Sequence, residues 1–138
     1  MLRPFHLAIP VDDLEAADEF YGDFLGCPRG RRSKMFIDFD FQGHQLVVHL
    51  SPQNCGGEGA NPVDGDTVPV RHFGLVLTPE DWRAMAARFE EAGRPFLIAP
   101  RVRFEGEPGE QGTFFVRDPA GNALEFKMFE DEGRLFAT

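Results

Sequence analysis

The chain repeats one pattern, and this repeat restricts its possible folds more than any other feature. His6 and His72 each lie inside an apolar run typical of a β-strand, HLAIPV and HFGLVL. Each histidine stands six residues before a predicted helix N-cap, Asp12 in one case and Thr78 in the other. The repeat therefore predicts two related halves, each opening with a strand and a helix.

Apolar spacing predicts the other elements of each half. Helical spacing after Asp12 indicates a first helix of about three turns that ends at Gly26, with Glu15 completing a capping box. The second helix begins at Pro79 and stops at Gly93. Further strands are expected at KMFIDFDF, QLVVHL, FLIAP, GTFFVRD and ALEFKMF, with a short edge strand in CPRGRRS. Each half therefore reads as β-α-β-β-β, an α+β fold.

Length and composition indicate one domain over residues 1–138. A hydrophobic fraction of 42% with fifteen Phe supplies material for a single core. We place a first module at about 4–51 and a second at about 70–129. Residues 52–69 are dense in Gly, Pro, Asn and Asp, so they are interpreted as an irregular linker or long surface loop. Residues 130–138 form a C-terminal tail.

Charge and hydropathy exclude several classes of function. A formal net charge of -9 argues against binding of nucleic acid or an anionic membrane, which require clustered Lys and Arg. No apolar run approaches the ~20 residues that span a bilayer, and the N-terminus lacks a signal-peptide pattern. We expect a cytoplasmic protein. Its two cysteines, Cys27 and Cys55, are expected to be free thiols.

Two motifs connect the repeat to a known family. FYGDFLG closes the first predicted helix, and DPAGNALEF forms the last predicted hairpin. Together with the repeat, they resemble the vicinal oxygen chelate superfamily, which includes glyoxalase I, extradiol dioxygenases, fosfomycin and bleomycin resistance proteins, and methylmalonyl-CoA epimerase. The resemblance extends from Pro4 to Phe129. The FDFQGHQLVVHL stretch looks most like a small bacterial group labelled predicted extradiol dioxygenases.

The resemblance implies both an architecture and a set of metal ligands. Each four-stranded sheet would curl, and the two sheets would form a cleft with ligands from the first and last strands of each half. These positions fall on His6, His72 and Glu125. The fourth is best matched by His49, because a shift of two residues preserves the face of a strand. Whether His49 is a ligand or a catalytic acid or base stays open.

Two imidazoles and one carboxylate suit Fe(II), which we favour, as well as Mn, Co, Ni or Zn. Open coordination positions would let a small substrate bind through two vicinal oxygens. The leading hypothesis is therefore a metal-dependent, extradiol dioxygenase-like oxidoreductase that forms a homodimer. A glyoxalase-like lyase or isomerase and a non-catalytic binding protein of the bleomycin-resistance kind are the alternatives.

Other polar residues have simpler interpretations. His44 is expected to be a solvated turn residue, and Tyr21 to pack in the core. Arg101, Arg103 and Arg117 flank the strands of the second half, where they would either meet an anionic substrate or lie on the solvated face of a strand.

Overall fold

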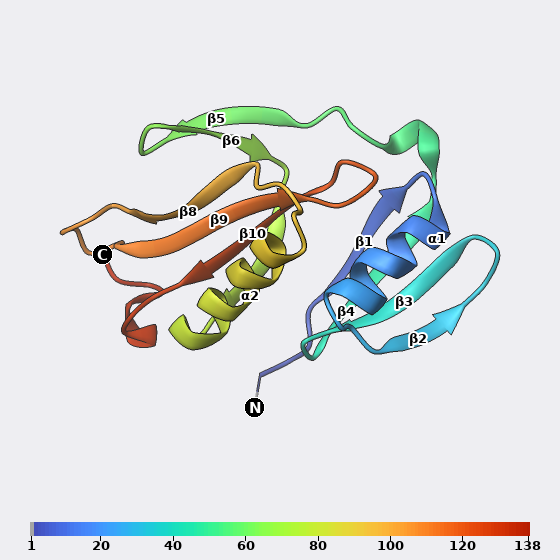
Figure 1. Ribbon diagram of the computed structural model, residues 1–138, viewed down its shortest axis with the longest axis horizontal. Coiled ribbons are helices and arrows are strands. Elements are labelled where there is room, and N and C mark those ends of the chain that lie inside the picture. Colours follow the sequence, from blue (N-terminus) through green and yellow to red (C-terminus); the bar gives the residue numbers. More distant parts are fainter. Residues whose placement is uncertain (1) are drawn as a thin grey trace. The chain divides into compact units, whose positions relative to one another are not determined.

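The computed structural model describes residues 2–138, which form two compact units (Figure 1). The first contains the residues up to Gly57 together with Asp118–Asn122, and the second contains Glu58–Arg117 and Ala123–Thr138. The division at Gly57 falls inside the predicted linker. Both halves follow the predicted β-α-β-β-β order, so the α+β class is confirmed.

The first unit is built on a four-stranded mixed sheet with the order β1-β4-β3-β2. The strand β1 is parallel to β4, and the other neighbours are antiparallel. The short edge strand β2 confirms the prediction made for CPRGRRS. The elements of this unit are β1 (His6–Val11), α1 (Leu14–Ala17), η1 (Asp18–Phe24), β2 (Arg29–Arg32), β3 (Phe36–Phe41), β4 (His44–Leu50) and the short η2 (Pro52–Asn54).

The first helix differs from its prediction in its cap and in its winding. Asp13, not Asp12, is the N-cap, and its carboxylate accepts a hydrogen bond from the Ala16 N–H at 3.0 Å. The capping box of Asp12 with Glu15 is therefore wrong. After α1 the helix widens into the π-helix η1, in which the Leu25 N–H donates to the Phe20 carbonyl.

A side chain from β2 contacts the widened part of this helix. Arg29 donates to Asp18 at 2.7 Å and to Asp23 at 2.9 Å. A Cβ added at Gly22 would lie within 2.3 Å of the Arg29 guanidinium. Glycine at this position therefore lets the arginine bridge two carboxylates of one helix.

The alternating apolar residues of β3 contribute to the core of the first unit, as predicted. Ile37, Phe39 and Phe41 are buried on one face of the strand. Tyr21 of η1 is fully buried, and its ring lies 5.6 Å from that of Phe39, which confirms it as a core residue. The opposite face of the sheet therefore stays available for polar residues such as His6.

The second unit repeats the sheet with the order β7-β10-β9-β8. Thr78 caps α2 by accepting from the Asp81 N–H at 3.1 Å. Trp82 packs on Phe114 and donates its indole N–H to the Phe126 carbonyl at 2.9 Å. The repeated elements are β7 (Phe73–Leu77), α2 (Pro79–Glu91), β8 (Ile98–Arg103), β9 (Gln111–Arg117) and β10 (Ala123–Met128), followed by the short η3 (Glu132–Arg134).

The predicted linker is not irregular throughout. It contains a hairpin of β5 (Gly59–Val63) and β6 (Asp66–Val70), which lies along β8 in the second unit (Figure 1). Asp64 and Gly65 form its two-residue turn with positive φ values of 43° and 86°. Composition predicted an irregular segment, but its Asp-Gly pair is a strong hairpin signal. Arg101 and Arg103 also hold the turn by ion pairs.

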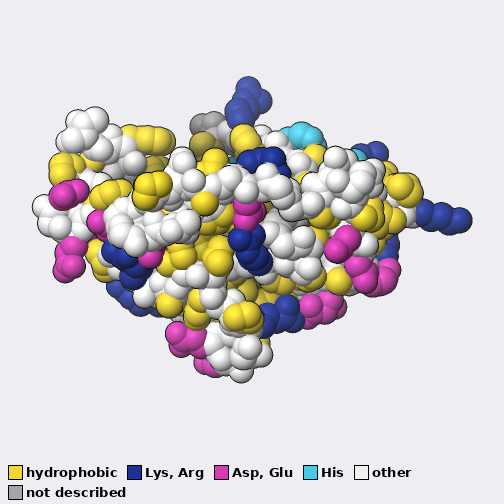
Figure 2. Space-filling view, turned by 90° about the horizontal axis from the view of Figure 1, so that it is seen from above, with side chains coloured by type: hydrophobic (Ala, Val, Ile, Leu, Met, Phe, Trp, Pro, Cys, Tyr) yellow, Lys and Arg dark blue, Asp and Glu magenta, His cyan; other side chains and the backbone are white. Residues whose placement is uncertain are grey.

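No helix among the described residues is long and apolar enough to cross a membrane. Figure 2 shows one face of the molecule, on which basic and acidic side chains of the described residues are interspersed. No extended basic patch is visible on that face, in keeping with the net charge of -9.

Candidate functional site

His72 lies between two strands of the second unit, just after β6 and just before β7. Its Nδ1 donates to the Pro69 carbonyl at 2.6 Å, because a carbonyl oxygen can only accept. The ring packs edge-on against Phe115, with centroids 5.0 Å apart. These contacts fix the orientation of the imidazole and leave Nε2 as the atom available to other groups.

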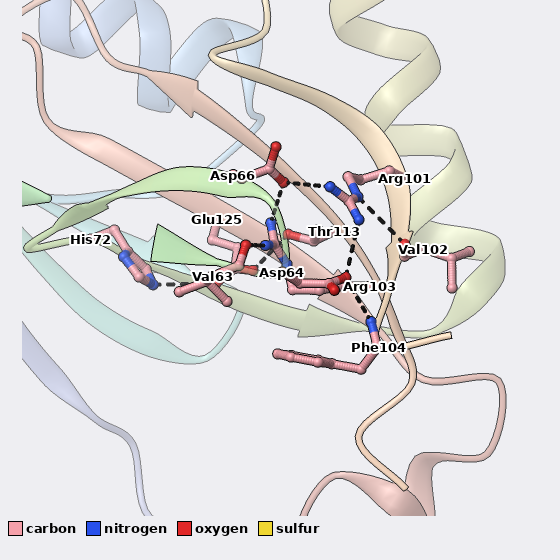
Figure 3. A network of polar contacts seen from close by, with 10 residues as sticks. All are labelled: Val63, Asp64, Asp66, His72, Arg101, Val102, Arg103, Phe104, Thr113 and Glu125. Carbon is pink, nitrogen blue, oxygen red and sulfur yellow. Dashed lines mark hydrogen bonds and ion pairs between the residues drawn. The ribbon is translucent and has the colours of Figure 1, made fainter. Parts of the chain in front are cut away.

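Glu125 lies on β10 and is buried. Its Oε1 is 3.2 Å from His72 Nε2, and its Oε2 accepts from the Thr113 hydroxyl at 2.6 Å (Figure 3). A Cβ added at Gly74 of β7 would lie 1.6 Å from the Glu125 carbonyl oxygen. Glycine is therefore required where the two strands approach at Glu125.

The contact between His72 and Glu125 shifts the pKa values of both groups. The hydrogen bond to Glu125 is the main cause that raises the pKa of His72, aided by the bond to Pro69 and opposed by desolvation. Desolvation raises the pKa of Glu125, but the bonds from His72 and Thr113 outweigh it and hold that pKa below its usual value. Lys127, on the same face as Glu125, lowers both pKa values by its charge.

His6 is the first residue of β1 in the first unit and is exposed. Its Nδ1 lies 2.9 Å from Oε1 of Gln45, which stands directly opposite on β4. Because that oxygen can only accept, Nδ1 carries the proton and Nε2 has a free lone pair. In both His6 and His72, Nδ1 therefore carries a proton that is held by an acceptor, Gln45 in one case and Pro69 in the other.

The strand registers correct the predicted match between His49 and Glu125. In the second unit, Glu125 pairs with Gly74, two residues after His72. The residue that pairs two positions after His6 is Val47, opposite Ala8. Val47 also stands four residues after Gly43, as Glu125 does after Gly121. The assumed difference of two residues between the hairpins is therefore wrong, and the position equivalent to Glu125 carries an apolar residue.

His49 pairs with Pro10, four residues along β1 from His6. This offset corresponds to roughly 13 Å along the sheet. His49 is exposed, shares the sheet face of His6, and has its ring 6.1 Å from that of Phe36. Its proposed role as an acid or base stays a prediction.

Among the predicted site residues, the structure brings His72 and Glu125 into contact and places His6 and His49 in the first unit. Within residues 2–138, no group of three or more His, Cys, Asp or Glu side chains is close enough together to hold a metal ion. Sequence reasoning missed Gln45, Thr113 and Pro69, because their contacts depend on strand register and on the predicted linker.

The arginines considered for anion binding are all paired with acids. Arg103 is only 3% exposed and contacts Asp66 at 3.0 Å, while Arg101 bridges Asp64 and Asp66 at 3.0 Å each (Figure 3). Arg117 contacts Glu58 at 2.5 Å. These guanidinium groups hold the polypeptide together, and Arg103 is buried rather than on the solvated face of a strand.

Two smaller predictions have separate outcomes. His44 lies in β4 and accepts a hydrogen bond from the Phe5 N–H at 2.8 Å, so it is not simply a solvated turn residue. Cys27 and Cys55 are not joined in a disulfide, as predicted.

An open hollow of about 520 Å³ lies in the first unit beside the first residues of β4. Gly30, Asp38 and Asp40 line it, as do His44 and Gln45. Because Gln45 also contacts His6, the hollow adjoins that histidine.

Comparisons with known proteins agree with this fold. A Pseudomonas aeruginosa protein named Uncharacterized protein PA2024 is 30% identical in an alignment of 135 residues that covers 93% of this chain and 89% of that protein. The crystal structure of a glyoxalase/bleomycin resistance protein/dioxygenase from Alicyclobacillus acidocaldarius is 38% identical, with a TM-score of 0.82 and coverage of 97% and 96%.

A lactoylglutathione lyase from Agrobacterium tumefaciens has a TM-score of 0.65 at 22% identity, covering 99% of this chain and 97% of that one. At this identity the likeness concerns the fold. The family model of the Glyoxalase/Bleomycin resistance protein/Dioxygenase superfamily matches residues 3–126. The repeated sheets and this match over most of the sequence lead to one conclusion: the chain belongs to the glyoxalase/bleomycin resistance protein/dioxygenase superfamily, the vicinal oxygen chelate superfamily.

Proposed function

We propose that the chain is a metal-dependent, extradiol dioxygenase-like oxidoreductase that acts on a small substrate with vicinal oxygens. His6, His72 and Glu125 would hold its divalent metal ion, with Fe(II) favoured. The proposal depends mainly on the contact of 3.2 Å between His72 Nε2 and Glu125 Oε1.

The atoms in this contact suit a shared metal ion. Two ligand atoms, each about 2.1 Å from one ion and separated by 90° to 109°, lie about 3.0–3.4 Å apart. The observed 3.2 Å falls within this range. The remaining polar atoms, His72 Nδ1 and Glu125 Oε2, are bound by Pro69 and Thr113 in the manner usual for metal ligands.

The apolar residue at the fourth position favours the oxygenase chemistry over its alternatives. With Val47 in place of a donor, the set would be two histidines and one carboxylate, the facial arrangement of non-heme iron oxygenases. A glutathione-linked glyoxalase would be expected to have a carboxylate as the fourth ligand, and this position has none. A bound ion of this type supplies Lewis acidity and open coordination positions.

The surrounding residues would determine which substrates bind. Phe115 is almost fully buried beside His72 and provides an apolar wall on one side of the imidazole. Lys127 adds positive charge on the face of Glu125, which would favour a substrate whose vicinal oxygens carry negative charge.

We also propose that the chain forms a homodimer. Each four-stranded sheet has two edge strands, β1 and β2 in one unit and β7 and β8 in the other. Unpaired strand edges gain stability when another chain covers them. Light scattering after size-exclusion chromatography would measure the oligomeric state, and a monomer at micromolar concentration would contradict this part of the proposal.

The test of function begins with elemental analysis of anaerobically purified protein. We expect about one iron per chain in the wild type and none in the His72→Ala and Glu125→Ala variants. His49→Ala is the matched control, because its register separates it from His6, and it should keep its iron.

Oxygen uptake with a panel of catechols would then test the reaction type. Uptake that depends on His72 and Glu125 would support the proposal. Iron-loaded protein without uptake, or protein that takes up nickel, zinc or cobalt instead, would favour a glyoxalase-like lyase or isomerase. Absence of metal even after reconstitution would exclude both enzymes and leave a binding protein.

A further inference from the structure

Each proposed ligand has one polar atom occupied by a neighbouring residue. Gln45 accepts from His6 Nδ1 at 2.9 Å, Pro69 accepts from His72 Nδ1 at 2.6 Å, and Thr113 donates to Glu125 Oε2 at 2.6 Å. These neighbours leave Nε2 of His6, as well as Nε2 of His72 and Oε1 of Glu125, which lie 3.2 Å from each other. In all three cases the neighbour therefore selects which atom is available for coordination.

We propose that Thr113 and Gln45 are positioning residues for the metal ligands. Thr113 would hold the Glu125 carboxylate so that Oε1 is the coordinating atom, and Gln45 would hold His6 in the tautomer with a free Nε2. This inference rests on the proposed function, and it adds a role for two side chains that the ligand set alone does not assign. Pro69 acts through its backbone, so it cannot be tested by deleting a side chain.

The geometry around Thr113 allows little else than this role. Its side chain is fully buried on β9, on the face that carries Glu125, and stands opposite Lys127 in the strand register. Its hydroxyl makes a short bond to a carboxylate that is itself buried. A β-branched side chain has few χ1 rotamers in a strand, so the donor is rigidly aimed. Rotation of the Glu125 carboxylate away from Thr113 would leave the buried hydroxyl without its acceptor.

Gln45 reaches His6 across two neighbouring strands. The two residues are directly paired in the parallel register of β1 with β4, and the side-chain oxygen lies at hydrogen-bond distance from the ring. Both side chains are exposed, so water competes for this bond. We therefore expect a smaller effect from Gln45 than from Thr113.

The first experiment compares Thr113→Val with Thr113→Ser. Valine keeps the shape and loses the donor, whereas serine keeps the hydroxyl. We expect the affinity for Co(II), measured by calorimetric titration, to fall about 10- to 100-fold for valine and to change by less than about threefold for serine. The visible spectrum of the Co(II) complex should shift only in the valine variant, since that spectrum reports ligand geometry.

Thr67→Val provides a matched control for this comparison. Thr67 is an exposed residue of β6 in the same unit, and its replacement should leave Co(II) affinity and spectrum unchanged. Thermal unfolding of the metal-free variants separates a loss of stability from a loss of ligand orientation. Equal Co(II) affinity and equal spectra for Thr113→Val and Thr113→Ser would overturn the role of Thr113.

The second experiment reads the His6 tautomer in metal-free protein by ¹⁵N NMR of histidine-labelled samples. Gln45→Leu should move His6 away from the Nδ1–H form, while Gln45→Glu should retain it. His72 serves as an internal reference, because its acceptor is the Pro69 carbonyl. An unchanged His6 tautomer in Gln45→Leu would overturn the role of Gln45.

The outcomes distinguish this inference from the proposed function. A wild-type protein that binds no Co(II) would refute the proposed metal site and, with it, the role of Thr113. A wild-type protein that binds Co(II) as tightly as both the Thr113→Val and Gln45→Leu variants would refute only the positioning roles.

Discussion

The two four-stranded sheets have the same strand order and the same pairing directions, but they differ where chemistry is expected. Glu125 of the second sheet has Val47 as its counterpart in the first. Phe115, which pairs with Glu125, has Asp38 as its counterpart, and Asp38 contacts Arg31 at 3.2 Å. The comparison shows that the repeat preserves backbone pairing while single side chains on one face determine which sheet can supply a carboxylate ligand.

Exchanging these counterparts is expected to have the largest effect. Glu125→Val removes the only anionic donor of the proposed set, so metal affinity should fall by about 1,000-fold, equivalent to about 4 kcal/mol. Val47→Glu should do the reverse, because it adds a carboxylate at the fourth position. Calorimetric titration with Zn(II) or Co(II) measures both changes.

The Val47→Glu variant has an additional signature. Val47 is only 6% exposed, so a carboxylate there is buried without a partner when no metal is present. The metal-free variant should be less stable than wild type, and added metal should recover the loss. A variant that is destabilised to the same extent with and without metal would show that position 47 does not face the proposed site.

The edge strands of the two sheets form a second contrast. All four residues of β2 are exposed. In contrast, β8 contacts the β5–β6 hairpin by the ion pairs of Arg101 and Arg103 with Asp66. Arg103→Met would remove the buried donor to Asp66 and to the Val63 carbonyl, while Arg101 keeps Asp66 paired, so the free energy of unfolding should fall by about 2–4 kcal/mol. Urea denaturation measures this loss.

Arg32→Met on β2 is the matched control for Arg103→Met. Arg32 pairs with Glu15, and both side chains are exposed, so the loss should stay below about 1 kcal/mol. Equal losses for the two variants would show that the hairpin contributes no more than a surface ion pair.

The two β-hairpins that end the repeats also differ. Gln42 and Gly43 make the short turn between β3 and β4, whereas Asp118–Asn122 joins β9 to β10 yet belongs to the first unit. Asp118 accepts from Tyr21 at 2.7 Å and from the backbone and side chain of Asn122. The longer turn is therefore tied to a buried hydroxyl of another element.

Loss of the hydrogen bond between Tyr21 and Asp118 should destabilise the protein moderately. Asp118→Ala leaves the Tyr21 hydroxyl buried and unpaired, and should cost about 2–3 kcal/mol, while Tyr21→Phe should cost about 1 kcal/mol. Gln42→Ala in the short turn should change stability by less than either. Denaturant unfolding with equal losses for all three variants would contradict the distinction between the turns.

The smallest expected effect is a pH dependence confined to the second sheet. The raised pKa of His72 means that its pairing stabilises metal-free protein fully below about pH 6.5 and less as pH rises through that pKa. The lowered pKa of Glu125 adds stability above about pH 4.3 that is lost as pH falls through it. Their joint contribution is therefore largest between these values.

A denaturation series in the presence of chelator checks this window. The difference in unfolding free energy between wild type and His72→Gln should decrease as the pH rises from about 5.5 to 8.5. Glu125→Gln should show a weaker dependence, because the partner charge is gone. A constant difference across the range would mean that the contact does not shift the titration of His72.

Much of the architecture could be predicted from local patterns. The alternation in FIDFDF located the buried face of β3, and Thr78 with Pro79 located the start of α2, because both signals act within a few residues. The first helix was predicted less well. Its π-helical part lies against Arg29 of β2 at Gly22, and spacing does not reveal such a contact between elements.

The candidate site could likewise be predicted only in part from the sequence. Two histidines at matched offsets from helix caps, and an acid inside ALEFKMF, which is costly to bury without a partner, indicated a candidate site. Their neighbours could not be inferred. Thr113 contacts Glu125, and Gln45 contacts His6, only because of the register between neighbouring strands. The acceptor for His72 is Pro69, which lies in the segment predicted as a linker.

By itself, the sequence determined the repeated strand and helix order, the buried faces and the candidates for a metal site, because these depend on side-chain chemistry and short-range spacing. The tertiary structure decided that Val47 rather than His49 matches Glu125, and that Arg101 and Arg103 bind a hairpin. The physical reason is that register and ion pairing depend on which strands become neighbours, and a shift of two residues leaves the alternation of a strand unchanged.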